Sequence, residues 1–201
     1  MILIDGGGNL NEEYDTGKMT ILPYLLSHQI SQIDLMIISH FDLDHCQGLV
    51  YLLDKIPVKQ VIIGKQYETS ENYEKFSQMI QEKQISVKIL GKGDEINLDS
   101  HTKLKVLWPT NSFITDNPLN NNAFVFQLLY RNRSILFCGD IEKEAEAEML
   151  KQIKPEVLQA DILKVAHHGA KTSSTVAFLD QVNPKIALIG VRSKQSIWAS
   201  E

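Results

Sequence analysis

The change of sequence character at Gly91 constrains the fold of this chain more than any other feature. Before Gly91, short apolar runs alternate with amphipathic stretches, which predicts strands and helices in the order βαβαβ. After Gly91, strand-like runs follow one another between loops rich in Asn, Asp and Pro, which predicts an antiparallel meander. The chain then returns to alternating helices and strands. This order predicts two sheets stacked between outer helices, in one four-layer domain over residues 1–201.

The residue patterns also give bounds for each element. The expected strands are 1–5, 33–39, 59–64, 87–90, 95–98, 104–108, 123–130, 134–138, 162–166 and 185–189. The expected helices are 20–30, 46–55, 70–84, 142–154 and 172–182. Pro23 falls in the first turn of its helix, where its missing N–H costs nothing, and Ser70 is a favourable N-cap.

Composition excludes several classes of protein. The 201 residues are 43% hydrophobic and 22% charged, with a formal net charge of -5. A chain of this size buries roughly 70% of its unfolded surface, so it needs no disulfide or structural zinc to form a core. No apolar run approaches the ~18 residues of a membrane helix, and the first residues lack the features of a secretory signal. Cys46 and Cys138 alone do not indicate a disulfide framework.

The first of three polar segments follows an expected apolar strand and has the spacing His-x-Asp-x-Asp-His. It contains His40, Asp42, Asp44 and His45. In an extended segment alternate residues face the same way, so His40 and Asp42 are predicted to share one metal ion. The adjacent Asp44 and His45 then turn toward a second ion. The competing interpretation is a solvated polar loop.

The other two segments also end expected strands. Asp140 follows Gly139 and could bridge two cations, although Gly-Asp after a strand is more often a turn. His167 and His168 precede Gly169, which lets the backbone come close. Consecutive histidines point apart, so one can bind metal while the other faces substrate or is held by a carboxylate. A surface histidine pair is the alternative.

These segments, with the Asp-Gly-Gly start at Asp5, resemble the metallo-β-lactamase superfamily in order, spacing and placement. More narrowly, four segments resemble the C-terminal hydrolase domain of the ComEC competence proteins. They are the start at 4–7, the His-x-Asp-x-Asp-His segment with aspartate at position 42 where histidine is commoner, and the segments 139–142 and 164–169. The resemblance implies a mixed α/β fold, the four-layer αββα sandwich. It also implies two divalent metal ions, Zn or Mn, and a nuclease that degrades one strand of incoming DNA during transformation.

The resemblance also implies roles for individual residues. His40 and Asp42 would bind one metal ion, Asp44, His45 and His168 the other, and Asp140 would bridge them. Asp5, Gly169 and Lys171 are expected to support the site.

We expect a net charge of about +1 at this site, because two divalent cations carry +4 and three aspartates remove 3. Such a site attracts phosphate, which a metal-bridging hydroxide would attack. His167, oriented by Glu142, is the expected proton donor. Together with the metal ligand Asp44, these two residues form the predicted catalytic set. Aspartate at position 42 makes Mn a serious competitor to Zn.

The chain departs from the family pattern in several places. Between the first two segments it has only His101, in an expected turn, while the run 120–122 of three asparagines lies nearer the place of the family's further histidine. The first metal ion is therefore expected to lack a protein ligand. Ala170 replaces a common serine. The chain lacks the family's leading strands and its closing Gly-His-Pro region, which predicts a fragment or a degenerate copy.

Single-stranded DNA is the expected substrate. The candidate contacts are basic residues after position 160, equally explained as a solvated face, and aromatic residues that could stack on bases or pack in the core. They are Lys164, Lys171, Lys185, Arg192, Lys194, Trp108, Phe113 and Trp198.

Two other functions stay open: a hydrolase of a small ester, thioester or phosphoester on the same fold, and an inactive metal-binding remnant. The expected location is that of a soluble domain. If its parent is a ComEC-like membrane channel, it would be held on the outer face of the cell membrane, and otherwise it would be cytoplasmic.

Overall fold

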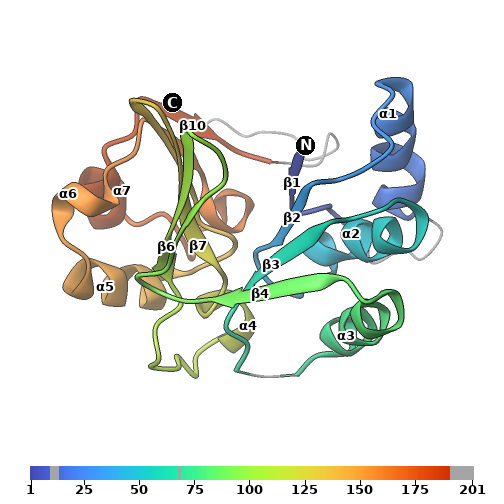
Figure 1. The fold of residues 1–201 in the computed structure, drawn as a ribbon. Helices are drawn as coiled ribbons and strands as arrows, with labels where there is room; N and C mark the ends of the chain where they lie inside the picture. The colour runs from blue at the N-terminus through green and yellow to red at the C-terminus, as the bar shows by residue number, and fades with distance from the viewer. Residues whose placement is uncertain (10–13, 68, 191–201) are drawn as a thin grey trace.

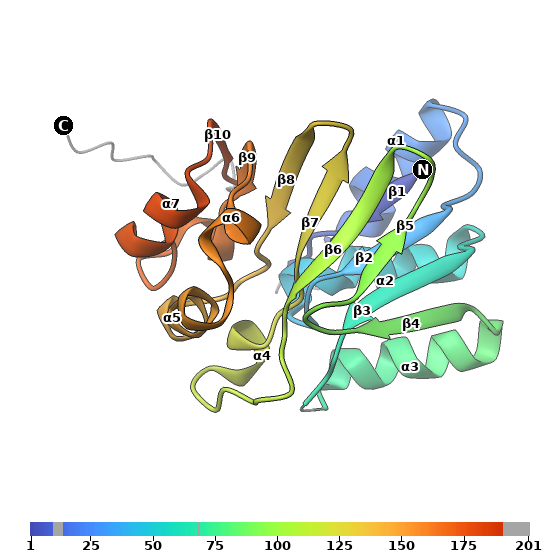
Figure 2. The same cartoon turned by 60° about the vertical axis from the view of Figure 1, so that its left-hand side comes forward.

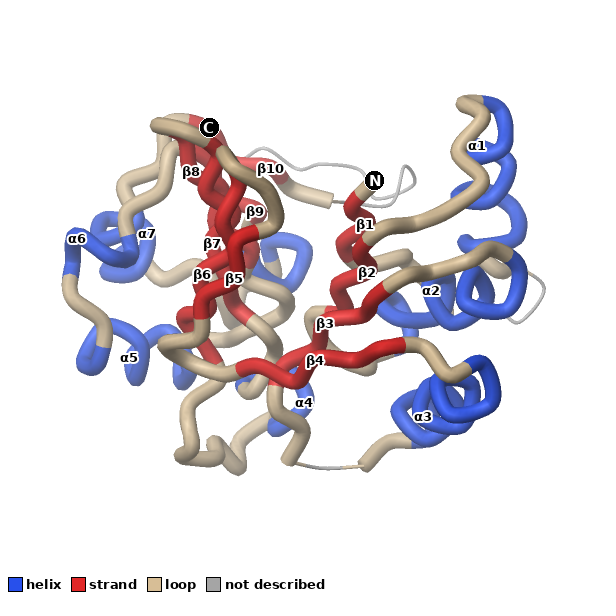
Figure 3. Tube along the Cα trace, in the orientation of Figure 1, coloured by secondary structure: helices blue, strands red, loops and turns tan. Residues whose placement is uncertain are grey.

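The computed structural model describes residues 1–9, 14–67 and 69–190. Two β-sheets face each other, and helices cover the outer face of each (Figure 1). The strands form two separate inner layers between these helices (Figure 3). This arrangement is the αββα sandwich that the sequence predicts. Within the described residues, no helix is both long and apolar enough to cross a bilayer.

The first half of the chain forms a four-stranded parallel sheet with strands in sequence order. The strands are β1 (Ile2–Ile4), β2 (Leu35–Ile38), β3 (Gln60–Gly64) and β4 (Ser86–Leu90). The helices of this half are the π-helix η1 (Gly17–Ile21), α1 (Leu22–Ser27), α2 (Leu43–Lys55) and α3 (Glu71–Lys83). All of β2 is buried because its alternate residues pack in different layers. Leu35 and Ile37 belong to the core between the sheets, and Met36 and Ile38 to the core under the helices.

The second half forms a six-stranded sheet in the order β10-β9-β8-β7-β6-β5 (Figure 2). Its strands are β5 (Glu95–Asn97), β6 (Thr102–Trp108), β7 (Val125–Tyr130), β8 (Arg133–Phe137), β9 (Ile162–Lys164) and β10 (Ile186–Leu188). Strands β5 to β8 are antiparallel, which confirms the predicted meander, and β8, β9 and β10 are parallel. Its helices are α4 (Pro118–Asn121), α5 (Lys143–Gln152), α6 (Pro155–Leu158), the 3-10 helix η2 (Ala166–Gly169) and α7 (Val176–Val182).

Three phenylalanines pack among aliphatic side chains in the core between the sheets. The ring centroids of Phe126 and Phe137 lie 5.0 Å apart and stacked, and those of Phe124 and Phe126 lie 5.1 Å apart. Trp108 is buried in the neighbouring core, where its indole Nε1 donates to the carbonyl of Asn121 at 2.8 Å. This tryptophan therefore serves packing and is not available to stack on a base.

Three expected helices differ from the structure by three or more residues at an end. The helix expected over 46–55 begins at Leu43, so Asp44 and His45 lie in its first turn and not in an extended segment. The helix expected over 20–30 is a π-helix followed by a short α-helix that ends at Ser27.

Two short helices, α4 and α6, were not expected. Both begin at a proline and have four residues, too few for a helical period to show in the sequence.

The helix expected from residue 172 begins only at Val176. The buried carboxylate of Glu146 accepts from the backbone N–H groups of Ser174 and Thr175, and this contact holds the segment in a turn. Thr175 then caps the helix by accepting from the N–H of Phe178 at 3.3 Å. Contacts with another helix thus delay the start of α7.

Candidate metal centre

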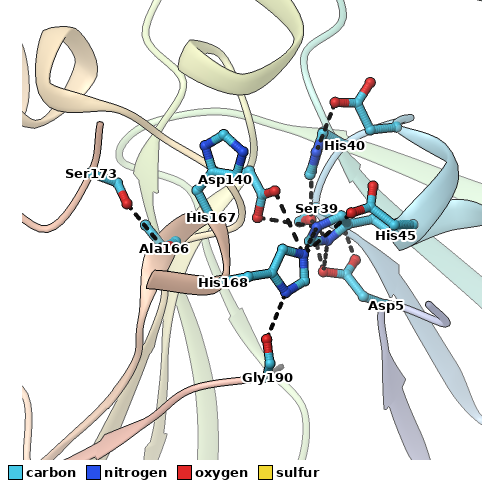
Figure 4. A network of polar contacts seen from close by, with 12 residues as sticks. Asp5, Ser39, His40, His45, Asp140, Ala166, His167, His168, Ser173 and Gly190 are labelled. Atoms are coloured by element: carbon cyan, nitrogen blue, oxygen red, sulfur yellow. Dashed lines mark hydrogen bonds and ion pairs between the residues drawn. The ribbon is translucent and has the colours of Figure 1, made fainter. Parts of the chain in front are cut away.

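The three polar segments meet at one edge of the sandwich (Figure 4). His40 follows the end of β2, Asp140 follows β8, and His168 follows β9. Helix α2 contributes Asp44 and His45 from its first turn. Ligand sites in α/β proteins commonly lie outside the carboxyl ends of strands. The fold therefore brings together side chains separated by more than one hundred positions, as the spacing of His45 and His168 illustrates.

Four of the predicted ligands form a tight cluster. One ligand atom from each of Asp44, His45, Asp140 and His168 lies within 4.8 Å of all the others. The Nε2 atom of His45 lies 3.1 Å from Asp140 Oδ1 and 3.2 Å from His168 Nε2. His168 Nε2 in turn lies 3.4 Å from Asp44 Oδ2. Two imidazoles and two carboxylates around one point suit Zn or Mn.

Hydrogen bonds at the far side of each imidazole orient it toward this point. Asp5 Oδ2 lies 2.9 Å from His45 Nδ1, and the carbonyl oxygen of Gly190 lies 2.9 Å from His168 Nδ1. A carbonyl only accepts, so Nδ1 of His168 donates, which leaves a lone pair on Nε2 when the ring is neutral. This pattern is usual for metal-binding histidines. Both imidazoles therefore fit a metal ion.

Ser39 is a supporting residue to which the sequence interpretation assigned no role. Its N–H and its hydroxyl donate to the two carboxylate oxygens of Asp5, each at 2.8 Å. The same hydroxyl lies 3.0 Å from His40 Nδ1 and 3.3 Å from His45 Nδ1. Asp5 was expected to support the site, and these contacts show how its carboxylate is held. The serine precedes His40 in the polar segment, which is the one signal that could have revealed it.

His40 and Asp42 lie beside the four-residue cluster without joining it. Their closest charged atoms are 3.6 Å apart, and the rings of His40 and His45 have centroids 4.1 Å apart. His40 Nε2 and Asp140 Oδ1 are both buried and have no aligned hydrogen-bond partner. Buried polar atoms are normally satisfied, so this pair of atoms indicates a missing ligand such as a cation. That His40 and Asp42 bind a separate ion stays a prediction.

The first metal ion is expected to lack one protein ligand, and His101, Asn121 and Asn122 do not supply it. His101 is exposed in the turn before β6, whereas the candidate site lies near the opposite end of that sheet. The side-chain oxygen of Asn121 accepts from the N–H of Glu142, and the amide of Asn122 donates to carbonyls of its own segment. Asn120 keeps a buried side-chain oxygen without a partner.

His167 turns away from the cluster toward a carboxylate. Its Nδ1 lies 3.3 Å from Glu142 Oε1. Thr172 donates to the same carboxylate at 2.6 Å and Asn117 donates to its other oxygen at 3.0 Å. His167 and His168 both have left-handed backbones, with φ of 47° and 52°, and their side chains contact different partners. The structure thus brings together the predicted His167 and Glu142, whereas no sequence signal pointed to Thr172 or Asn117.

The electrostatics of the cluster are those of a network of ion pairs. Burial alone would lower the pKa of His45, but its contacts with Asp140 and Asp5 outweigh burial and raise that pKa to about 10. Burial would raise the pKa of Asp5 and of Asp140, and their contacts with His45 lower both. The hydrogen bond between Asp44 and His168 lowers the pKa of the carboxyl and raises that of the imidazole. A cation that binds here must therefore displace protons.

The remaining predicted residues are the supporting residues Gly169 and Lys171 and the basic and aromatic candidates for DNA contact. Gly169 has φ of 78°, which favours glycine, and Lys171 is exposed after it. Lys185 pairs with Asp161 at 2.7 Å, and Lys164 donates to the carbonyl of Val165. Arg192, Lys194 and Trp198 lie outside the described residues.

Comparison with known proteins gives the family. Residues 2–191 match the model of the metallo-beta-lactamase superfamily. The chain is 30% identical to ComE operon protein 3 of Bacillus subtilis (strain 168) over 94% of its own length and 25% of that protein. It is 28% identical to Recombination protein 2 of Haemophilus influenzae, again over 94% of this chain and 22% of the other. The chain thus spans about a quarter of the length of these relatives.

Solved structures give the fold. A variant of the CmlA beta-hydroxylase superposes with a TM-score of 0.51 at 14% identity, over 78% of this chain and 36% of the other. The family match covers almost the whole chain, and the sandwich and the site follow the same pattern. The chain therefore belongs to the metallo-β-lactamase superfamily.

Proposed function

We propose that this member of the superfamily is a metal-dependent phosphodiesterase that cleaves single-stranded DNA. The observation that carries the proposal is the convergence of Asp44, His45, Asp140 and His168, whose ligand atoms all lie within 4.8 Å of one another. Divalent cations held there would activate water and offset the negative charge of a phosphodiester.

The chain's own residues supply orientation and a proton. Asp5 and the Gly190 carbonyl hold the two imidazoles of the cluster. His167 is the proton donor to the departing oxygen of the substrate, because it precedes the cluster residue His168 in the chain, is 30% exposed and is oriented by Glu142.

The setting in the cell is part of the same proposal. The relatives include a protein of the ComE operon and a recombination protein, both about four times as long as this chain. We infer that the chain acts as the hydrolase domain of a DNA-uptake system, alone or with a membrane-channel parent or partner. One strand of the incoming DNA would then enter the cell, and this domain would degrade the complementary strand once it is single.

The test is hydrolysis by purified protein with Mn²⁺, with Zn²⁺ and with EDTA. The substrates are end-labelled single-stranded DNA, the matching duplex, and a panel of thioesters, lactones and small phosphoesters. Asp140→Asn should reduce cleavage to background, whereas Asp180→Asn, on the exposed face of α7, should not. Metal-dependent cleavage of single-stranded DNA is the expected result.

Two outcomes would overturn the proposal. Hydrolysis of the small esters without cleavage of DNA would show a different substrate class on the same site. Less than one bound ion per chain at saturating Mn²⁺ or Zn²⁺, with no hydrolysis, would show an inactive metal-binding remnant.

A further inference from the structure

A hollow open to solvent adjoins His40, between the loop after β3 and helix α4. Its enclosed volume is about 10 Å³, and its walls include His40, Lys65, Tyr67, Pro118, Leu119 and Asn122. This is room for about one water molecule, so the hollow is a shallow depression, against whose wall one group of a larger substrate can lie without being enclosed. His40 also lies beside the metal centre, since its ring centroid is 4.1 Å from that of His45.

An aromatic ring is fixed at the wall of this hollow. The ring of Tyr67 packs against Phe113 with centroids 5.4 Å apart. Its hydroxyl donates to the carbonyl of Thr110, so the ring is held at both its face and its tip. Pro118 and Leu119 add apolar surface on the opposite element. A rigid aromatic face beside apolar side chains is the kind of surface on which a nucleobase stacks.

The wall of α4 is also fixed. The side-chain amide of Asn122 donates to the carbonyls of Ile114 and Pro118 at 2.9 Å and 2.8 Å. Its oxygen accepts from the N–H of Ile114 at 3.1 Å. The hollow therefore has a preformed shape, which lowers the entropy that a bound group would lose.

A cation stands at the same wall. Lys65 donates to Asn111 Oδ1 at 2.5 Å, and Asn111 is neutral. Within the described residues no carboxylate pairs with this lysine, whereas other lysines are paired, such as Lys59 with Asp34. The positive charge of Lys65 is therefore available to a phosphate.

We propose that this hollow binds the nucleotide next to the scissile phosphate of single-stranded DNA, with its base on Tyr67 and its outer phosphate on Lys65. Proteins that bind single strands combine these two elements, an aromatic platform and a basic contact. A substrate without a base would lose the contact with Tyr67. The inference rests on the proposed phosphodiesterase function and names the part of the substrate that the site reads.

Binding is tested in the Asp140→Asn background with Mn²⁺, so that cleavage does not interfere. The probe is a fluorescein-labelled oligothymidylate of six nucleotides, followed by anisotropy. Tyr67→Ala should weaken binding about tenfold, whereas Tyr67→Phe, which keeps the ring, should restore it. Lys65→Gln should weaken binding and lower the salt dependence by about one phosphate contact.

Matched controls lie at the opposite end of the sandwich. Tyr130, which is 49% exposed, ends β7 far from the site. Lys59 lies just before β3, whereas Lys65 lies just after it. Tyr130→Ala and Lys59→Gln should leave binding unchanged. Equal losses from these controls, or no loss from Tyr67→Ala, would overturn the subsite.

A pair of substrates separates this inference from the proposed function. Thymidine 5′-(p-nitrophenyl phosphate) and methyl p-nitrophenyl phosphate share a leaving group and differ in the nucleoside. Tyr67→Ala should raise KM for the thymidine substrate about tenfold and leave KM for the methyl substrate unchanged. Equal effects on both substrates would overturn the subsite while the phosphodiesterase stands. Failure of the unsubstituted protein to hydrolyse either substrate would overturn the phosphodiesterase, and the anisotropy experiment would still decide the subsite.

Discussion

The two sides of the metal centre are built in different ways. The N-terminal side consists of residues 5–8 and 39–48, and the C-terminal side of residues 166–169. On the first, the His45 side chain is 5% exposed and Asp5 and Ser39 hold its ring. On the second, the His168 side chain is 38% exposed and its Nδ1 contacts a single backbone carbonyl. The N-terminal side is preorganised by the core, whereas the C-terminal side depends more on the ion it would bind.

The largest expected effect tests this difference directly. His45→Ala and His168→Ala should each abolish ion binding at the four-residue cluster, as measured by metal analysis. In EDTA the two variants should differ. His45→Ala should lower the free energy of unfolding by about 3 kcal/mol, because the buried Asp140 and the partly buried Asp5 lose their cationic partner. His168→Ala should cost less than about 1 kcal/mol, because its ion pairs are partly exposed.

Urea unfolding in EDTA measures both costs, with His28→Ala, on the exposed end of α1, as the control. Equal losses from His45→Ala and His168→Ala would contradict the comparison between the two sides.

Glycines sharpen the same comparison. A Cβ on Gly48 would lie 2.3 Å from the carbonyl oxygen of Gly6, so the loop of residues 5–8 could not stay against α2. Gly48→Ala should therefore destabilise the chain by about 3 kcal/mol, even though alanine favours a helix by about 1 kcal/mol. A Cβ on Gly169 would meet only Ile189, at 3.5 Å. Gly169→Ala should cost about 1 kcal/mol, from its left-handed backbone alone.

Thermal and urea unfolding of the two glycine variants give these values. If Gly169→Ala proved the more damaging, the C-terminal side would be the more tightly built of the two.

The sequence predicted the layers because their causes are local. Alternation of apolar runs and amphipathic stretches defined the two halves, and the meander after Gly91 followed from its loops. The start of α2 was misplaced because the candidate metal ligands of its first turn, Asp44 and His45, look like a polar loop. Periodicity is a poor guide where polar residues face a site and not solvent.

The side chains of the candidate site could be predicted from the sequence, whereas the hydrogen bonds that orient them could not. Asp5, Asp140 and His168 are residue types that commonly bind or support metal ions, so they stand out in the sequence. The carbonyl of Gly190 supports His168 through the backbone, which leaves no mark in the choice of side chain. Thr172 reaches Glu142 across a sequence separation of 30 residues, and only the fold shows that contact.

His167 is the third test, because it lies on the C-terminal side but belongs to no ligand cluster. His167→Ala should lower kcat about 100-fold, while the ion content stays that of the unsubstituted protein. Glu142→Gln should lower kcat less, since it removes the charge that orients the imidazole and keeps the ring. Steady-state kinetics on single-stranded DNA, with metal analysis of each variant, measure both effects. Unchanged kcat for His167→Ala would remove this histidine from the reaction.

The smallest expected effect concerns the support behind the ligands. Asp5→Asn should weaken ion binding about tenfold, because the amide can still contact His45 but no longer carries the charge that makes its ring a stronger ligand. Competition with a fluorescent chelator measures the affinity. On the C-terminal side the equivalent support for His168 is the neutral Gly190 carbonyl, which orients a ring without adding charge. A tenfold loss for Asp5→Asn would show that the N-terminal side sets the affinity through charge as well as position, and an unchanged affinity would reduce Asp5 to the same orienting role as that carbonyl.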